Sequence, residues 1–164
     1  MSKSKDDSAL LAAIGRVTVE AGRLEVLLAE IADSLVNPAE LWVGKAFTTD
    51  IPLNRLIDAV IWLYSERRLP KTKHLKSILE GVFKLAQERN RIVHSRWIIS
   101  PIIPGLPVLP IRTRTESRNQ KGPVYRREHF TERQINYLAD KIAQSTSRLI
   151  PFWKHAVRLS DLDV

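Results

Sequence analysis

Cysteine is absent from the 164-residue sequence. Its absence excludes disulfides, thiol nucleophiles and thiolate metal sites, and it leaves the cellular compartment open. No group of histidines and carboxylates has the spacing of metal ligands either. We therefore expect neither a metal site nor a cofactor.

Long hydrophobic runs are also missing. The chain opens with the polar residues MSKSKDDS and no apolar segment follows them, so we expect no secretory signal. The most apolar stretch, residues 97–111, contains four prolines and is too short to span a bilayer. These features predict a cytoplasmic protein without a membrane partner.

Positive charge is in excess, with a formal net charge of +8 and a pI near 10.0. Most of the excess lies in one short segment that contains a single acidic residue, Glu116. The basic residues of this segment are Arg112, Arg114, Arg118, Lys121, Arg126 and Arg127. Such a segment favours a nucleic acid as a partner, although a solvated basic segment that binds nothing specific accounts for the charge equally well.

Apolar residues at steps of three and four predict five helices: 8–36, 39–47, one that Asp50 caps, about 71–96, and one from Thr131 onward. The sequence TERQ at the start of the last helix is a capping box, in which a threonine and a glutamine satisfy free N–H groups. Pro151 is expected to kink this helix, because proline removes a backbone hydrogen bond. The pattern predicts an all-α fold, a single four- to five-helix bundle over residues 1–164.

The insert between the last two helices, about 97–130, breaks the helical pattern. Its first half is proline-rich and is predicted to be extended. Its second half alternates weakly, which fits a basic β-hairpin with Gly122 near the turn.

The fourth helix carries a polar interruption in the segment KLAQERNRIVH, residues 84–94. Residues three and four positions after Ala86 share its face of the helix, so Arg89 and Asn90 fall on the stripe expected to be buried. A buried arginine needs a partner or a water-lined cavity, because burying an unpaired charge is costly.

Two interpretations of this interruption remain open. In the structural one, Arg89 forms an ion pair with Glu25 of the first helix, and His94 is only a favourable charge at a helix C-terminus. In the catalytic one, Asn90 orients the His94 imidazole one turn away. Arg89 and His94 lie about 140° apart around the helix axis, so a shared site is easier where two copies of the helix meet across a two-fold axis. The catalytic interpretation therefore predicts a homodimer.

The segment RNRIVH, Arg89 to His94, resembles the signature of the HEPN superfamily (higher eukaryotes and prokaryotes nucleotide-binding). In that signature an arginine and a polar residue, often asparagine, precede a histidine near the end of a bundle helix. The resemblance implies a helical bundle that dimerises at the motif. Many members are metal-independent endoribonucleases of toxin–antitoxin, phage-defence or RNA-processing systems, so the resemblance also implies this activity. One toxin subgroup has a tyrosine two residues after the histidine, where this chain has Arg96, so silencing by a nucleotidyltransferase antitoxin is not expected. Another antitoxin or regulatory protein stays a candidate partner.

If the motif is catalytic, the 2′-hydroxyl of RNA attacks the adjacent phosphate. His94 would act as general base or acid, Arg89 would offset charge on the phosphate oxygens, and Asn90 would hold the imidazole or a phosphate oxygen. Further RNA contacts are expected from Arg91 and Arg96 beside the motif and from the basic residues of the insert. Trp97 and Tyr125 are candidates for base stacking, although packing is the simpler role for both.

Two other arginine–histidine pairs have similar spacing, Arg68–His74 and Arg148–His155. Pro70 and Pro151 interrupt them, so both matches look accidental. We expect His74 and His129 to face solvent and His155 to lie at the edge of the bundle.

Three functions are consistent with these features. The first is a HEPN-like endoribonuclease. The second is a non-catalytic HEPN-like module that binds nucleotides, RNA or a partner protein. The third is a helical interaction protein in which Arg89 pairs with Glu25 and the motif is accidental.

Overall fold

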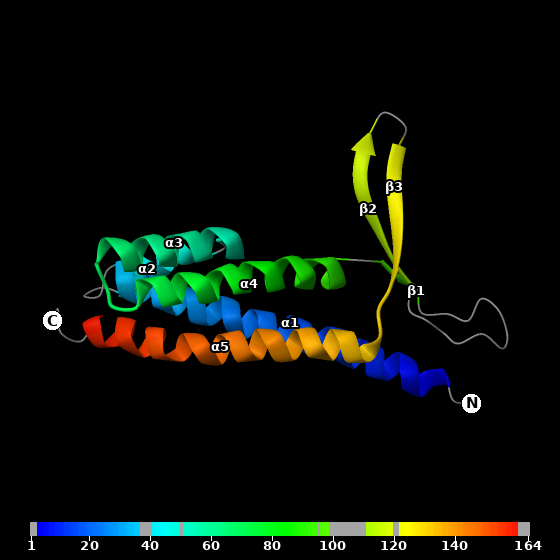
Figure 1. Cartoon of the computed structure of the whole chain (residues 1–164), viewed down its shortest axis with the longest axis horizontal. Helices are drawn as coiled ribbons and strands as arrows, with labels where there is room; N and C mark the ends of the chain where they lie inside the picture. The colour runs from blue at the N-terminus through cyan, green and yellow to red at the C-terminus, as the bar shows by residue number, and fades with distance from the viewer. Residues whose placement is uncertain are drawn as a thin grey trace.

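The structure, a computed structural model, describes residues 3–36, 41–49, 51–94, 96–98, 111–119 and 122–160. Five helices form its body: α1 (Lys3–Val36), α2 (Leu41–Thr48), α3 (Leu53–Glu66), α4 (Thr72–Val93) and α5 (Glu132–Ser160). The long helices α1, α4 and α5 lie side by side, α3 covers one half of α4, and α2 packs at the end of α1 (Figure 1). The predicted helical class is confirmed. None of the helices in the described ranges has the length and hydrophobicity needed to cross a membrane.

Helix α1 is amphipathic along its length, and its predicted stripe forms the centre of the core. The buried residues recur at steps of three and four: Leu10, Ala13, Val17, Ala21, Leu24, Leu28, Ile31 and Leu35. Helix α5 packs along the same stripe with its own buried residues, Ile135, Leu138, Ile142 and Leu149. The core therefore lies mainly between these two helices, with α3 and α4 closing it.

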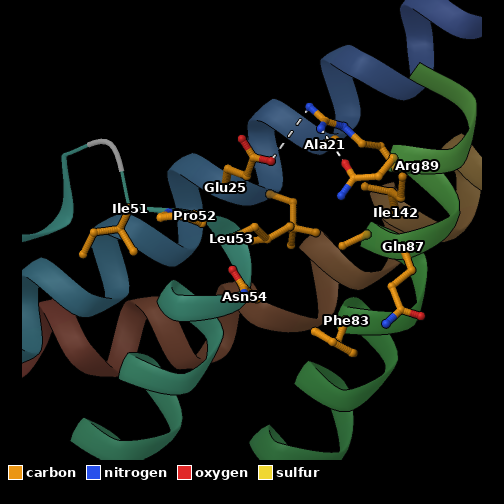
Figure 2. A pocket seen from close by; sticks show the side chains of 13 residues that line it. Ala21, Glu25, Ile51, Pro52, Leu53, Asn54, Phe83, Gln87, Arg89 and Ile142 are labelled. Atoms are coloured by element: carbon orange, nitrogen blue, oxygen red, sulfur yellow. Dashed lines mark hydrogen bonds and ion pairs between the residues drawn. The ribbon is translucent and has the colours of Figure 1, made fainter. Parts of the chain in front are cut away.

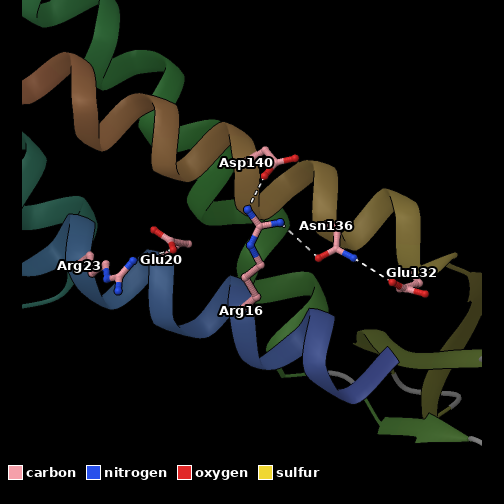
Figure 3. Close-up of polar contacts among 6 residues, drawn as sticks. All are labelled: Arg16, Glu20, Arg23, Glu132, Asn136 and Asp140. Atoms are coloured by element: carbon pink, nitrogen blue, oxygen red, sulfur yellow. Dashed lines mark hydrogen bonds and ion pairs between the residues drawn. The ribbon is translucent and has the colours of Figure 1, made fainter. Parts of the chain in front are cut away.

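A polar cluster beside the core joins α1 to α5 (Figure 3). Arg16 donates to the Asp140 carboxylate at 2.5 Å and, more weakly, to the Asn136 carboxamide oxygen at 3.4 Å. The Arg16 and Asp140 side chains are 44% and 59% exposed, and an exposed ion pair contributes at most about 1 kcal/mol. The cluster therefore fixes how the two helices align more than it stabilises them.

Helix α2 approaches α1 closely at Gly44. A Cβ atom at this position would lie 2.6 Å from the Asp33 Cα, so only glycine fits. The Thr48 hydroxyl donates to the Asp33 carboxylate at 2.5 Å, which gives this buried acid a partner. The prediction of a short second helix over 39–47 is close to the observed Leu41–Thr48.

Several helix ends differ from the predictions. Helix α1 begins at Lys3, five residues earlier than expected. Pro52 occupies the N-cap position of α3 without a side-chain hydrogen bond, and the predicted cap, Asp50, lies outside the described residues. Helix α5, by contrast, continues through Pro151 to Ser160 as its apolar pattern predicts, and the kink expected at Pro151 stays a prediction.

The predicted capping box at the start of α5 is confirmed. The Thr131 N–H donates to the Gln134 Oε1 at 2.8 Å, and the Gln134 N–H donates to the Thr131 Oγ1 at 3.2 Å. Further along α5, Phe152 and Ala156 are buried, whereas Trp153 and Val157, which a step of four from Leu149 would place on the core stripe, are only partly buried. The buried face follows a step of three residues after Leu149 instead of the predicted step of four.

Helix α4 ends at Val93, and the prediction that it reaches residue 96 is wrong. The His94 N–H bonds to the Asn90 carbonyl at 3.1 Å, and the chain is extended from Arg96. The Trp97 indole N–H donates to the Ile92 carbonyl at 2.9 Å and so satisfies a free group at the helix end. His94 is therefore the C-cap of α4 and not part of its last turn.

Three strands follow α4: β1 (Arg96–Ile98), β2 (Ile111–Asn119) and β3 (Gly122–His129). They form an antiparallel sheet in the order β1-β2-β3, with an irregularity between Thr115 and Ser117. The strands β2 and β3 project from the end of the bundle where α4 ends and α5 begins (Figure 1). Residues 99–110, which we predicted to be extended, lie outside the described part of the chain.

Candidate functional site

A cleft of about 520 Å³ opens between α1, the start of α3 and the second half of α4 (Figure 2). It exists because α3 has 14 residues against 22 in α4 and leaves the second half of α4 uncovered. Its polar lining residues are Glu25, Asn54, Gln87, Arg89 and Asn90. Its apolar lining includes Leu24, Leu53, Phe83 and Ile142.

Two residues of α4 whose spacing would place them on the buried stripe are exposed at this cleft. Phe83 is 42% exposed and Asn90 is exposed. Both line the cleft together with Leu53 and Asn54 from the start of α3. The buried position near the end of α4 is Ile92, at 2% exposure, which the stripe pattern missed.

Arg89 enters the cleft from α4 and is largely buried, with 20% of its side chain exposed. Its Nη1 donates to the Asn90 Oδ1 at 2.9 Å, and its Nη2 lies 4.0 Å from the Glu25 Oε1 (Figure 2). Its Nε is buried and has no partner among the described residues. The Arg89–Glu25 ion pair expected by the structural interpretation is therefore present, but it is longer than a hydrogen bond.

His94 does not join Arg89 and Asn90 in this cleft. Its side chain is exposed beyond the end of α4, and it is not among the residues that line the cleft. The Asn90 carboxamide oxygen accepts from Arg89, and within the described ranges no hydrogen bond joins Asn90 to the imidazole. A single chain therefore brings Arg89 and Asn90 together and leaves His94 apart.

Most of the predicted RNA contacts fall where the structure does not describe side chains. Arg91 is described: it forms an ion pair with Glu88 at 2.6 Å, one turn earlier on α4. The others are Arg96, Arg112, Arg114, Arg118, Arg126 and Arg127, of which only the backbone is described, and Lys121, which lies outside the described residues. The strand register places Arg114 directly opposite Arg126.

Trp97 packs against other apolar residues of the protein. Its ring meets Phe130 edge-to-face at 6.1 Å, and it lies against the hydrophobic core. This outcome agrees with the simpler of the two roles considered for it. The Tyr125 and His129 side chains lie outside the described part.

No protein-family model, curated protein or solved structure matches the chain. The described residues contain no group of three or more histidine, aspartate or glutamate side chains placed to hold a metal ion. The site therefore has to be judged on its own chemistry.

A second cavity contains residues that we had set aside. His74 and His155, with Arg148, Pro70 and Pro151, line a space of about 270 Å³ at the other end of α4. The sequence held a signal for it, because these residues belong to the two arginine–histidine pairs. We dismissed both pairs for the prolines that interrupt them, and these prolines form part of the cavity wall.

Proposed function

We propose that the protein binds RNA or a nucleotide in the cleft between α1, α3 and α4. The observation that carries this proposal is Arg89, a largely buried guanidinium at an open cleft. An arginine side chain has five N–H donors, and within the described residues only its Nη1 makes a hydrogen bond. The remaining donors can bind a phosphate oxygen in the planar geometry that suits a guanidinium.

The other lining residues suit the remaining parts of a nucleotide. Phe83 presents an exposed aromatic ring, and stacking of an unpaired base on such a ring contributes about 1–3 kcal/mol. The carboxamides of Asn54 and Gln87 offer a donor and an acceptor each, which is the pattern that reads base edges. We also propose that the helices form a HEPN-like bundle. The basic residues of β2 and β3 would bind further phosphates of an RNA that leaves the cleft.

Binding is measured by fluorescence anisotropy with a labelled single-stranded RNA. We expect Arg89→Ala to weaken binding about tenfold or more, because a hydrogen bond to a charged group contributes about 1.5–3 kcal/mol. Arg158→Ala removes an exposed arginine at the far end of α5 and serves as the charge-matched control. Equal affinities for the wild type and Arg89→Ala would exclude the cleft as the RNA site.

A second candidate function, cleavage of the bound RNA, is favoured by the RNRIVH motif. We propose it as a metal-independent endoribonuclease, a toxin or defence effector with an antitoxin or regulatory partner. Since one chain leaves His94 outside the cleft, cleavage needs a second copy to supply the imidazole. RNA incubated in EDTA should be cut by the wild type and not by His94→Ala or Arg89→Ala. Binding without cutting in the wild type would leave only the first function.

A homodimer is supported by an apolar face on α1 that points away from the core. Leu11, Val19 and Val26 are 57%, 54% and 60% exposed, and Gly15 and Gly22 lie between them. A Cβ atom at either glycine would meet nothing within 4 Å, so the chain's own packing does not require them. We expected the dimer at α4, but among its described large apolar residues only Phe83 is exposed.

The spacing on this face suits a second copy of the same chain. In an antiparallel pair of α1 helices with the two-fold axis between residues 18 and 19, Leu11 lies opposite Val26 and Gly15 opposite Gly22. A two-fold interface requires such self-complementarity, and glycine pairs let two helix backbones approach. Because Glu25 precedes Val26, the second copy would border the Arg89 cleft.

Sedimentation velocity tests the dimer. The wild type should sediment as a dimer, and Val19→Glu should be monomeric because it places a charge near the two-fold axis. Trp62→Glu makes the same kind of change at an apolar residue of α3 that is 61% exposed and should leave the dimer intact. Equal effects of both variants would argue against the α1 interface.

A further inference from the structure

The second cavity lies at the end of the bundle where α3 turns into α4. It has a volume of about 270 Å³, and its lining includes Tyr64, Lys71, His74, Arg148, Phe152 and His155. His74 is 15 residues from Arg89 on α4, which corresponds to about 22 Å at 1.5 Å per residue. The cavity is therefore separate from the cleft of the proposed function, and its role is a separate question.

The charge around this cavity has one sign. Lys71 and Arg148 are fixed cations, two imidazoles lie beside them, and no carboxylate is among the lining residues. Within the described residues, neither Lys71 nor Arg148 is within ion-pair distance of an acidic side chain. Helix α4 begins here as well, its N-cap Lys71 makes no side-chain capping bond, and a helix N-terminus carries partial positive charge.

One buried polar atom in the cavity wall lacks a partner. The His155 Nε2 is buried and has no hydrogen-bond partner among the described residues. Buried polar atoms are nearly always paired, so this atom calls for an explanation, and a bound ion or water is one. The His155 ring is held by Tyr64, with ring centres 6.5 Å apart, and His74 packs against Phe152 at 5.9 Å.

We propose that this cavity binds a phosphate group, with Arg148, Lys71 and the two imidazoles around its oxygens. The His155 Nε2 would donate to one oxygen, and the guanidinium would bind two others in its planar geometry. The tyrosine and phenylalanine rings form an apolar wall that suits a sugar attached to the phosphate. The volume lies just below the usual range for small-molecule pockets, about 300–1,000 Å³, which favours a phosphate or a sugar phosphate over a dinucleotide.

Histidine NMR signals give a direct test, since the chain has only four histidines. Single His→Gln variants assign the signals, and inorganic phosphate, ribose 5-phosphate or AMP is then titrated at constant ionic strength against chloride. We expect the His74 and His155 signals to move together with one dissociation constant. Equal constants for the three compounds would assign recognition to phosphate alone, and tighter binding of the sugar phosphates would place the sugar in the cavity.

Variants separate this site from bulk charge and from the cleft. Arg148→Gln should raise the dissociation constant about tenfold. Arg133→Gln replaces an exposed arginine at the start of α5, the end of this helix away from the cavity, and should leave the constant unchanged. The shifts should persist in Arg89→Ala, so failure of the cleft would not affect this result. An absence of saturable shifts at His74 and His155, or an unchanged constant in a folded Arg148→Gln variant, would overturn the proposal.

Discussion

Replacing Glu25 with glutamine separates the structural and the binding interpretations of Arg89. The substitution keeps the size of the side chain and removes only the charge that lies 4.0 Å from the Arg89 Nη2. If Arg89 serves to hold α4 against α1, loss of the Glu25 charge should lower the free energy of unfolding. If Arg89 serves a phosphate, removing the competing carboxylate should strengthen RNA binding.

The size of both effects follows from distance and exposure. Two unit charges 4 Å apart interact by about 1 kcal/mol in water and about 4 kcal/mol at an effective dielectric constant of 20. The Glu25 side chain is 39% exposed, so the lower end applies and the fold should lose at most about 1 kcal/mol. A phosphate that no longer meets this carboxylate should gain a similar amount, roughly a fivefold increase in affinity.

Anisotropy with labelled single-stranded RNA and urea unfolding, measured on the same samples, give the two quantities. Glu20→Gln is the matched control, because Glu20 is on the same helix but does not line the cleft. Its carboxylate forms an ion pair of 2.9 Å with Arg23. RNA affinity should rise for Glu25→Gln and stay constant for Glu20→Gln. A loss of more than about 2 kcal/mol in unfolding free energy, with no gain in affinity, would refute the binding interpretation and make the pair structural.

Three further predictions concern the fold. Gly44→Ala should lower the unfolding free energy by about 1–3 kcal/mol, because its Cβ meets the Asp33 backbone. Gly81→Ala, with open space around it, should raise that energy by up to about 1 kcal/mol. If urea unfolding showed that both variants raise or both lower the unfolding free energy, this explanation would be wrong. Burial raises the pKa of Tyr64 to about 12 from 10.0. The unfolded chain therefore loses its proton first, and stability should fall between pH 10 and 12 by up to roughly 2–3 kcal/mol. Circular dichroism should show this loss in the wild type but not in a folded Tyr64→Phe variant. Thr131→Ala should cost about 1 kcal/mol in urea unfolding through the lost cap, and an unchanged midpoint would contradict that role.

The sequence predicts those parts of the fold that depend on residues close to one another along the chain. The α1 stripe is visible because a long helix with one buried face repeats its apolar residues over many turns. The box at Thr131 is visible because both partners lie three residues apart. The Arg89–Glu25 contact could also be predicted, since each residue interrupts or borders an apolar stripe and needs an opposite charge.

Features that depend on the length of a neighbouring helix could not be predicted. Nothing in the α4 sequence shows that α3 is shorter than α4 and leaves Phe83 and Asn90 at a cleft. The same limit applies to the second cavity. His74 and His155 are 81 residues apart in sequence, and only the packing of α5 against the start of α4 brings them to one space.

The ion pairs of the molecule, compared with one another, show what is unusual about Arg89. Arg16 is more exposed, at 44%, and still closes on its carboxylate at 2.5 Å. Arg89 is more buried, at 20%, and its carboxylate lies 4.0 Å away. A buried cation needs closer pairing than an exposed one, because its lost hydration must be replaced. An arginine whose role was only to align two helices would be expected to resemble Arg16. The loose pairing of a more buried guanidinium, at an open cleft, is instead what a site for an external acceptor requires. It is also the arrangement that Glu25→Gln should improve for an anionic ligand.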